Sequence, residues 1–466
     1  MSTRSLVFTA ERLLQVLSTF PEVNSYIVGL SGGADSTALV HALCKVRERL
    51  RVPFSAVHVN HGIHAESNLW QRQCEQFCRG QGVELTCLQI ELKHASGKGL
   101  EAEARQLRYE AMSSLLGPAD CLLTAHHADD QAETLLLNLM RGSGVDGLTA
   151  MPESRPLGDG YLQRPLLRFK NSVLKDYLHR HEIEWIEDPS NQYLNHDRNF
   201  VRHELIPLME KRWPEVNQRL LLTQDAMTDA RHLLERLADE YLEPNLYHPF
   251  VLHITPKCIT EPQLFRLVVR RWMRQSGVPV IPAYKLGTFV DQVKRADSDH
   301  KISVSWDRCL LRWYKDRLWL QTDSEIMPCP AVRWPGGQTE LDLGEDVGLM
   351  SIKAMEPTQR QLSPVIDMFT GSRFRVDSRV NIRDAVISQG SHHKSLKKLF
   401  QANEIPPWLR NSIPICLLDD EIVALGDWCF DEQFANWLSD HGIGLYWRPR
   451  HPILMYMHKQ KQKVNH

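Results

Sequence analysis

The 466-residue chain lacks several features that would assign it to a class at once. No apolar run approaches the about 18 residues that a membrane-spanning helix needs. The N-terminal segment Met1–Leu17 carries charges and no long apolar core, so no signal peptide is visible. The 10 cysteines include no C-x-x-C pair, which is typical of reduced, buried thiols and not of a disulfide framework. We therefore expect a soluble, cytoplasmic protein without a membrane partner.

The chain also has little net charge. The 55 Lys and Arg residues nearly balance the 57 Asp and Glu residues, which leaves a net charge of -2. This balance argues against an overall basic coat for nucleic acid, but a local basic face is compatible with it. Hydrophobic residues make up 42% and charged residues 24%, as in ordinary globular proteins. At roughly 150 residues per domain, the length predicts about three domains.

Apolar segments that predict strands alternate with helical patterns in the N-terminal part. The strand candidates are Tyr26–Leu30, Phe54–Val59, Leu85–Leu92, Cys121–Ala125 and Ile183–Ile186. Between the first two, Leu39, Leu43 and Val46 recur at helical spacing. This alternation predicts an α/β fold with a five-stranded, parallel, Rossmann-like sheet wrapped by helices. Ligands of such sheets bind beyond the carboxyl ends of the strands.

The pattern changes after Pro214. Val216–Tyr241 and Phe265–Gln275 predict helices, whereas Lys301–Trp306 and Leu318–Thr322 resemble strands, so we expect a mainly helical middle domain. The remainder has strand-like segments around a helix at 395–402, which predicts a small α+β domain. The expected divisions are a catalytic domain at 1–215, the middle domain at 216–326, a Pro/Gly-rich linker at 327–350, the C-terminal domain at 351–450 and a tail, disordered around its lysines, at 451–466.

One short segment between the first predicted strand and helix points to phosphate binding. Its residues are Ser31, Gly32, Gly33, Ala34, Asp35 and Ser36. Glycines let backbone N–H groups approach phosphate oxygens, and a following helix presents its positive end. Asp35 would repel phosphate unless it orients backbone groups or holds Mg²⁺. A Walker-type sequence is absent, and the alternative is a Gly-rich turn that binds nothing.

The hexapeptide resembles the pyrophosphate-binding loop of the N-type ATP pyrophosphatases, the PP-loop superfamily. Members split ATP between its α and β phosphates and form an adenylated intermediate. Further segments narrow the resemblance to the tRNA(Ile)-lysidine synthetases. They are Ala56–Gly62, Leu100–Tyr109, Thr124–Thr134 with Arg141–Gly144, Asp188–Asn191 and Arg198–Arg202, and Arg383–Phe434 resembles that family's C-terminal domain.

The resemblance implies an ATP-dependent carbon–nitrogen ligase on an adenine nucleotide alpha hydrolase-like sheet. Its substrates would be free L-lysine and a minor isoleucine tRNA with a CAU anticodon, and its cofactors ATP and Mg²⁺. ATP would activate the C2 oxygen of the wobble cytidine as an adenylate, and the lysine ε-amine would then displace AMP to form lysidine. Lysidine changes codon reading from AUG to AUA and amino-acid identity from Met to Ile. The oligomeric state stays open, with a homodimer as one option.

The resemblance also assigns roles to individual residues. Asp130 and Glu133 lie three apart on a predicted helix and would bind lysine. Arg105 would oppose triphosphate charge, Arg198 would contact the substrate side, and His126 would lie beside the reacting centre. The implied catalytic set is Asp35, Arg105, His126, Asp130, Glu133 and Arg198, with Asp35 as the Mg²⁺ ligand.

These residues also have structural interpretations. One carboxylate such as Asp130 can stabilise a helix N-terminus, and Arg105 can belong to a solvated helix face. Arg198 and Arg202 are four apart, as in ordinary helical salt bridges. The strand-end histidine His58 is expected to be a polar strand-end residue and not a catalytic one. Adjacent histidines at 126–127 suggest zinc, but no further ligand at a zinc-site spacing supports it.

A basic segment in the C-terminal part is the candidate tRNA contact. Lys394, Lys397 and Lys398 lie on a short predicted helix and could contact phosphates, with Arg410 nearby. A solvated lysine-rich helix is the alternative. Trp408 is expected to pack in a core or turn.

Three rival functions stay open. A cytidine 2-thiolase typically needs C-x-x-C pairs for an iron–sulfur cluster, and the nearest spacing here is Cys74 and Cys78. A GMP- or NAD-type synthetase would bring a recognisable extra domain. A non-catalytic RNA-binding module would gain nothing from the carboxylates Asp130 and Glu133.

Overall fold

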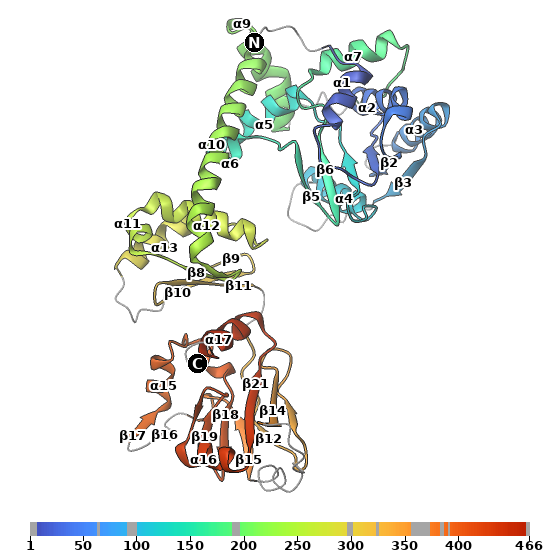
Figure 1. Cartoon of the computed structure of the whole chain (residues 1–466). Coiled ribbons are helices and arrows are strands. Elements are labelled where there is room, and N and C mark those ends of the chain that lie inside the picture. Colours follow the sequence, from blue (N-terminus) through green and yellow to red (C-terminus); the bar gives the residue numbers. More distant parts are fainter. Residues whose placement is uncertain are drawn as a thin grey trace. The chain divides into compact units, whose positions relative to one another are not determined.

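The computed structural model describes residues 7–62, 66–90, 100–188, 196–295, 302–322, 326–355, 373–382, 386–389 and 392–462. The chain forms two compact units, Met1–Leu233 and Leu234–His466, and Figure 1 colours it along the sequence. The end of the third predicted strand at 91–92, the motif residues 189–191, Arg383 and Lys463 lie outside the described residues.

The first unit contains a six-stranded sheet with the order β3-β2-β1-β4-β6-β5. Its strands are β1 (Tyr26–Gly29), β2 (Phe54–Asn60), β3 (Leu85–Gln89), β4 (Cys121–Leu123), β5 (Ser154–Leu157) and β6 (Gly160–Gln163). The first five in this order, from β3 to β6, are parallel, and β5 adds an antiparallel edge. The predicted parallel sheet is therefore confirmed, and so are four of its predicted strands.

The fifth predicted strand, Ile183–Ile186, is wrong. The fifth parallel strand is β6, and Ile183–Ile186 forms no strand. This segment packs Ile183, Trp185 and Ile186 against the apolar cluster of the first unit, and the Ile186 N–H donates to the Gly32 carbonyl at 2.9 Å. Its apolar side chains serve this packing, so the residue pattern resembles a strand although no ladder forms.

Helices cover both faces of this sheet. They are α1 (Ala10–Leu17), α2 (Ala34–Lys45), α3 (Ser67–Gln81), α4 (Leu100–Ser113), α5 (Ala128–Met140), α6 (Val145–Leu148) and α7 (Asn171–Arg180). Consecutive residues Ala56 and Val57 of β2 belong to different apolar clusters because successive side chains point to opposite faces. The Ala56 cluster includes residues of α1, α2, α3 and α7, whereas the Val57 cluster includes Met112 of α4.

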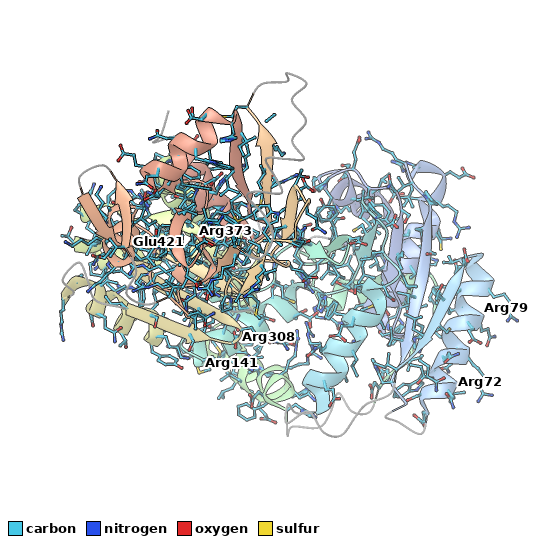
Figure 2. All side chains as sticks on the ribbon, turned by 90° about the horizontal axis from the view of Figure 1, so that it is seen from below. Arg72, Arg79, Arg141, Arg308, Arg373 and Glu421 are labelled. Carbon is cyan, nitrogen blue, oxygen red and sulfur yellow. The ribbon has the colours of Figure 1, made fainter. Side chains whose placement is uncertain are left out.

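Helix α3 illustrates how the cysteines and charges divide. Cys74 and Cys78 are buried in the Ala56 cluster, whereas Arg72 and Arg79 are exposed and project away from the sheet (Figure 2). The 10 cysteines are all free thiols. Burial raises the pKa of Cys74 to about 12, with the neighbouring Cys78 adding to the shift, so this thiol stays protonated at neutral pH.

A helical stretch closes the first unit and leads into the second. It consists of α8 (Asp197–Phe200), a π-helical turn (Val201–Leu205), α9 (Ile206–Arg212) and α10 (Val216–Asn245). The long helix predicted at 216–241 is confirmed and extends four residues further. The division between the two units falls inside α10, after Leu233, and not at the predicted boundary after residue 215.

The second unit begins with a region that combines helices and a sheet. Besides α10 it has α11 (Pro256–Thr260), α12 (Pro262–Gln275) and α13 (Ala283–Arg295), and an antiparallel sheet ordered β7-β8-β11-β10-β9. Its strands are β7 (Leu246–His248), β8 (Val251–His253), β9 (Ile302–Trp306), β10 (Cys309–Tyr314) and β11 (Arg317–Thr322). The helix predicted at 265–275 and both predicted strands are present, but the sheet makes this region more mixed than expected.

The rest of the second unit is α+β, as predicted. Two sheets, β12-β15-β18-β19-β20 and β13-β14-β21, share one apolar core with a hairpin and three helices. The elements are β12 (Val332–Arg333), β13 (Glu340–Asp342), β14 (Leu349–Ala354), β15 (Phe374–Asp377), β16 (Val386–Gln389), β17 (His392–Ser395), α15 (Leu396–Ala402), β18 (Ile415–Leu418), β19 (Glu421–Leu425), β20 (Cys429–Phe430), α16 (Glu432–Asp440), β21 (Ile443–Arg448) and α17 (Pro452–Gln462).

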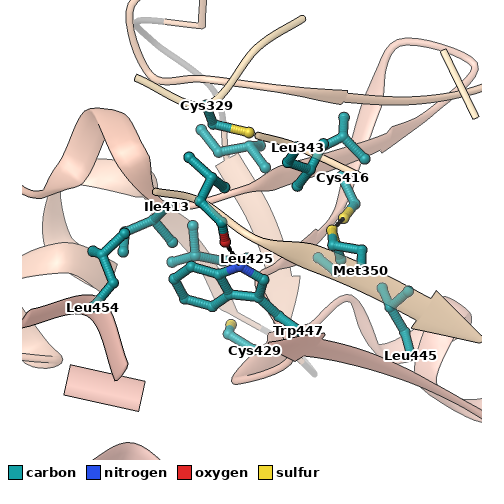
Figure 3. Close-up of a cluster of buried hydrophobic side chains, with 14 of the residues drawn as sticks. Cys329, Leu343, Met350, Ile413, Cys416, Leu425, Cys429, Leu445, Trp447 and Leu454 are labelled. Atoms are coloured by element: carbon teal, nitrogen blue, oxygen red, sulfur yellow. Dashed lines mark hydrogen bonds between the residues drawn. The ribbon is translucent and has the colours of Figure 1, made fainter. Parts of the chain in front are cut away.

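The predicted linker and tail are both wrong. Strand β14 pairs with β21, and Trp334 within the supposed linker is fully buried. The Trp447 indole N–H donates to the Val347 carbonyl at 2.7 Å within the same core (Figure 3). The tail forms α17, whose Leu454 is fully buried. Proline and glycine there shape turns between strands instead of separating domains.

Candidate active site

The phosphate loop lies between β1 and α2, as predicted. Ser36 Oγ accepts a hydrogen bond from the Ser31 N–H at 3.2 Å and donates to the Gly33 carbonyl at 3.0 Å. Thr37 Oγ1 donates to the Gly32 carbonyl at 3.1 Å. Gly33 is the N-cap of α2 and brings no capping side chain, so the positive end of this 12-residue helix stays available to an anion. The loop is thus held in shape by its own hydroxyl groups.

Gly32 is required by two features of the loop. Its φ of +85° lies in the left-handed region, which disfavours side chains. A Cβ atom added there would also lie 2.3 Å from Ile186 Cδ1. The segment that was predicted as a strand therefore forms one wall of the loop.

We expect Gly32→Ala to lower the free energy of unfolding of the first unit by about 2 kcal/mol or more, and to weaken ATP binding. The backbone must leave its conformation or Ile186 must move, and either change displaces the loop. Thermal unfolding and equilibrium ATP binding measure the two effects. Gly80→Ala in α3 is the matched control, since a Cβ there meets nothing within 4 Å. Equal ATP affinity of Gly32→Ala and wild type would contradict the assignment.

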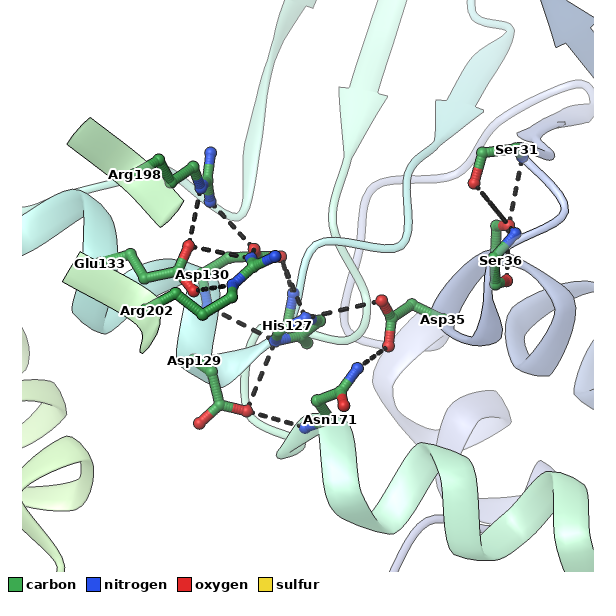
Figure 4. A network of polar contacts seen from close by, with 11 residues as sticks. Ser31, Asp35, Ser36, His127, Asp129, Asp130, Glu133, Asn171, Arg198 and Arg202 are labelled. Carbon is green, nitrogen blue, oxygen red and sulfur yellow. Dashed lines mark hydrogen bonds and ion pairs between the residues drawn. The ribbon is translucent and has the colours of Figure 1, made fainter. Parts of the chain in front are cut away.

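Asp35 connects this loop to the next part of the site. Its Oδ1 accepts a hydrogen bond from Asn171 Nδ2 at 2.7 Å, and its Oδ2 lies 3.5 Å from His127 Nε2. Burial raises the pKa of the Asp35 carboxyl, although the charge of His127 opposes the shift. Figure 4 shows Asp35 between the loop serines and a group of carboxylates and arginines.

His127 organises the start of α5, a role that the sequence did not indicate. The His127 ring nitrogen Nδ1 accepts a hydrogen bond from the backbone N–H of Asp130 at 3.4 Å. The backbone N–H of His127 in turn donates to Asp130 Oδ2 at 3.0 Å, so the two residues form a reciprocal cap. The ring also lies 3.5 Å from both Asp35 and Asp130 carboxylates. Its side chain is only 6% exposed, so His127 links the phosphate loop to α5 from the interior.

Asp129 belongs to the scaffold. It accepts hydrogen bonds from the Asn171 N–H at 2.8 Å and from Asn217 Nδ2 at 2.9 Å. These bonds attach α5 to the first turns of α7 and α10. Of the three acidic residues at the start of α5, Asp129 therefore has a structural role.

Asp130 and Glu133 face two arginines. Glu133, 1% exposed, accepts from Arg198 Nε at 2.7 Å and from Arg202 Nε at 2.5 Å. Asp130 Oδ1 accepts from Arg198 at 2.9 Å and from Arg202 at 3.1 Å. Burial alone would raise the pKa of Asp130, but His127 and Arg198 lower it below its usual value. The two carboxylates and two guanidinium groups form a compact, charge-balanced network.

This network holds the helical stretch after residue 196 against α5. Arg198 lies in α8 and Arg202 in the π-helical turn that follows. A π-turn adds a residue to the helical repeat, and such turns are frequent at functional sites. Both carboxylates are therefore paired with cationic side chains from this stretch.

His126 lies beside the network at the end of β4. Its Nδ1 is 3.0 Å from Thr124 Oγ1. Burial lowers the pKa of His126 to about 3; the Asp130 charge opposes this shift, and Arg164 and Arg105 add to it. The imidazole is therefore neutral at physiological pH and can donate or accept a hydrogen bond.

The remaining site candidates differ in their surroundings. Arg105 is exposed, and its guanidinium carbon lies 5.5 Å from the centre of the Tyr109 ring. His58 is buried, and its Nδ1 lies 2.9 Å from the Leu30 carbonyl oxygen, so it joins β2 to the end of β1. This contact agrees with the structural interpretation of His58.

Three protein-family models match parts of this chain. A PP-loop domain model matches residues 7–209, a TilS substrate binding domain model 260–319 and a TilS substrate C-terminal domain model 374–447. A tRNA(Ile)-lysidine synthase of Alkalilimnicola ehrlichii is 35% identical over 90% of this chain and 92% of its own. One of Methylococcus capsulatus is 36% identical over 91% of this chain and 97% of its own.

The chain belongs to the tRNA(Ile)-lysidine synthase family. The predicted resemblance and the predicted class, an ATP-dependent ligase, are confirmed. These relatives favour none of the three rival functions. Ser31–Ser36, His126, Asp130 and Arg198 all lie within the matched PP-loop domain. In the part of the chain that the structure describes, no helix is long and apolar enough to cross a membrane.

The candidate tRNA contacts lie in the matched C-terminal domain. Lys397 and Lys398 are exposed in the first turn of α15, whose Leu399 and Phe400 are buried. Lys394 is also exposed, but it lies in the preceding strand β17 and not on the helix, so its predicted helical position is wrong. The segment therefore has the solvated basic face and the apolar inner face of the structural interpretation, and the tRNA contact stays a prediction.

Arg410 is wrong as a surface tRNA contact. It is 7% exposed, its Nε donates to the Ile405 carbonyl at 3.0 Å, and its guanidinium carbon lies 5.8 Å from the Phe400 ring centre. These two contacts of Arg410 stabilise the loop after α15. Trp408 packs as expected, with the Arg312 guanidinium carbon 4.8 Å from its ring centre.

Proposed function

We propose that this chain ligates free L-lysine to C2 of the wobble cytidine of an isoleucine tRNA with a CAU anticodon. One observation carries the proposal: Asp35 and His127 join the phosphate loop directly to the Asp130 carboxylate of the arginine network. An ATP-activating loop and a site for a cationic substrate thus share one edge of the sheet.

In the first step, the cytosine C2 oxygen attacks the α-phosphorus of ATP and pyrophosphate leaves. The Ser31–Ser36 loop and the N-terminus of α2 hold the departing pyrophosphate through backbone N–H groups. Arg105 adds positive charge near His126, and this charge contributes to the lowered pKa of the His126 ring. The neutral His126 ring orients the base by a hydrogen bond.

Asp35 fits a role at a Mg²⁺ ion that ATP carries. Mg²⁺ is usually held by one or two carboxylates together with substrate phosphates. Within the described ranges, no group of three or more metal-ligating side chains is present, and Asp35 is the carboxylate in the loop itself. When bound, the ion would neutralise charge on the phosphates.

In the second step, the neutral lysine ε-amine attacks C2 and a carbon–nitrogen bond forms. The bond from C2 to the adenylated oxygen breaks, AMP leaves with that oxygen, and the new C–N group releases one amine proton to solvent. Asp130 and Glu133 hold lysine through its ammonium charge, and Arg198, which pairs with both carboxylates, contacts the substrate side. The arginines that pair with these carboxylates hold them in place before lysine binds.

Incubation of the protein with ATP, Mg²⁺, radiolabelled lysine and total tRNA tests this function. We expect label in the isoleucine tRNA with the CAU anticodon, with one AMP and one pyrophosphate formed per lysine. Transfer that does not depend on ATP, or no transfer to this tRNA, would refute the proposal.

We further propose that the exposed lysine face formed by Lys394 of β17 and by Lys397 and Lys398 of α15 contacts tRNA phosphates. The triple variant Lys394→Ala, Lys397→Ala, Lys398→Ala should weaken tRNA binding and lower the slope of log K against log salt by about 2. Titrations at several salt concentrations measure this slope. Arg410→Ala, by comparison, should lower thermal stability because Arg410 is buried. An unchanged tRNA affinity of the triple variant would remove the case for this face.

A further inference from the structure

Three arginines converge on one aromatic ring at the edge of the first sheet. The guanidinium carbons of Arg105 and Arg155 lie 5.5 and 5.3 Å from the centre of the Tyr109 ring. Arg164 interacts with the hydroxyl of the same tyrosine. Arg105 and Tyr109 come from α4, Arg155 from β5, and Arg164 follows β6. We call Arg105, Arg155 and Arg164 the arginine cluster.

No carboxylate among the described residues forms an ion pair with the arginine cluster. Arg155 donates to the Pro156 carbonyl at 3.4 Å and Arg164 to the Pro152 carbonyl at 2.7 Å. Arg164 is 5% exposed, and its buried Nε has no hydrogen-bond partner. Burial lowers the pKa of Arg164, and the charges of Arg155 and Arg105 lower it further. The interaction with Tyr109 opposes this lowering. Positive charge is therefore concentrated without compensation, which an anion would relieve.

The cluster lies on the opposite side of β4 from the phosphate loop. In the sheet order, β4 stands between β1, which leads into the loop, and β6, which leads into Arg164. His126 follows β4, and both Arg105 and Arg164 lower its pKa after burial. An anion on the cluster would therefore be a neighbour of the reacting base and separate from the triphosphate held at 31–36.

We propose that the arginine cluster binds a backbone phosphate of the tRNA anticodon loop next to the wobble cytidine. The inference rests on the proposed function. Guanidinium groups donate paired hydrogen bonds to phosphate, and their packing around Tyr109 orients them before RNA binds. β5 is the edge strand of its sheet, so a nucleic-acid strand can pass over Arg155 and place its base toward His126. The contact positions the substrate and does not read its sequence.

Binding of a synthetic anticodon stem–loop RNA, followed by fluorescence anisotropy at several salt concentrations, tests the site. Arg155→Ala should weaken binding of this RNA about tenfold, which corresponds to the low end of the free energy of a charged hydrogen bond. The slope of log K against log salt should fall by about 0.7, as for one single-strand phosphate. Arg155→Lys keeps the charge but not the paired hydrogen bonds, so it should keep the salt dependence of wild type and only part of the affinity. The control Arg51→Ala removes an exposed arginine that precedes β2, which lies on the other side of β1 and β4 from β6 and β5, and it should leave RNA binding unchanged.

Two further arms identify which phosphate is bound. Equilibrium dialysis with ATP should give the same affinity for Arg155→Ala and wild type. Stem–loops with one neutral methylphosphonate linkage should bind wild type less tightly when that linkage lies beside the wobble cytidine, and Arg155→Ala should be insensitive to it. Unchanged RNA binding, weakened ATP binding instead, or no sensitive linkage would each overturn the inference. Lysine transfer by wild type, measured in parallel, separates this failure from failure of the proposed function.

Discussion

Replacing Asp35 with alanine is expected to reduce tRNA-dependent pyrophosphate release by about 100-fold or more. Asp35 is the carboxylate within the phosphate loop, and it accepts from Asn171 at 2.7 Å and contacts His127 at 3.5 Å. Its removal takes away both the proposed Mg²⁺ ligand and the link from the loop to α5. Pyrophosphate release in the absence of lysine isolates the adenylation step.

Asp35→Asn separates the two roles of this residue. The amide oxygen can still accept from Asn171, but the negative charge is gone, so adenylation should remain as low as with alanine. Asp176→Ala, an exposed position on α7, is the control and should leave the rate unchanged. A rate for Asp35→Asn near that of wild type would show that geometry, and not charge, is what the loop requires.

Glu133→Gln is expected to raise the KM for lysine by about 10- to 100-fold while the KM for ATP stays within about threefold. Glu133 is 1% exposed and receives hydrogen bonds from Arg198 and Arg202. Glutamine keeps the volume but removes the charge that both arginines and the lysine ammonium require. Steady-state kinetics with lysine and ATP varied separately measure the two constants.

The same substitution should lower thermal stability, because it leaves Arg198 and Arg202 with Asp130 as their remaining carboxylate in the network. Unfolding of the variant with and without saturating ATP shows that the fold is retained under assay conditions. Glu48→Gln, exposed in the turn after α2, is the control. Equal increases in both KM values would contradict a lysine-binding role for Glu133.

Local patterns predicted the parts of the site that are local. The phosphate loop needs only six consecutive residues between a strand and a helix, and the structure has this arrangement at Gly29 and Ala34. Asp130 and Glu133 share a face because they are three apart on α5. Four strands of the parallel sheet were visible for the same reason, since apolar runs of this length carry their own signal.

The sequence predictions were wrong where a residue pattern typical of one structure instead makes a different tertiary contact. Ile183–Ile186 has the residues of a strand but packs beside Gly32, and Met327–Gly337 has the residues of a linker but includes the buried Trp334. Arg410 has the residue type of a phosphate contact but is 7% exposed. Burial depends on which segments meet in space, and composition alone does not record it.

By itself, the sequence determined an ATP-binding loop on a parallel sheet, a pair of acidic residues on one helix face and membership of one tRNA-modifying family. Only the tertiary structure decided the partners of those acidic residues. Arg198 is 65 positions from Glu133, and Asn171 is 136 from Asp35. No local rule relates such positions. Their contacts follow from the packing of α5, α7 and α8 at the carboxyl ends of the strands, which brings the loop, His127 and the arginine network together.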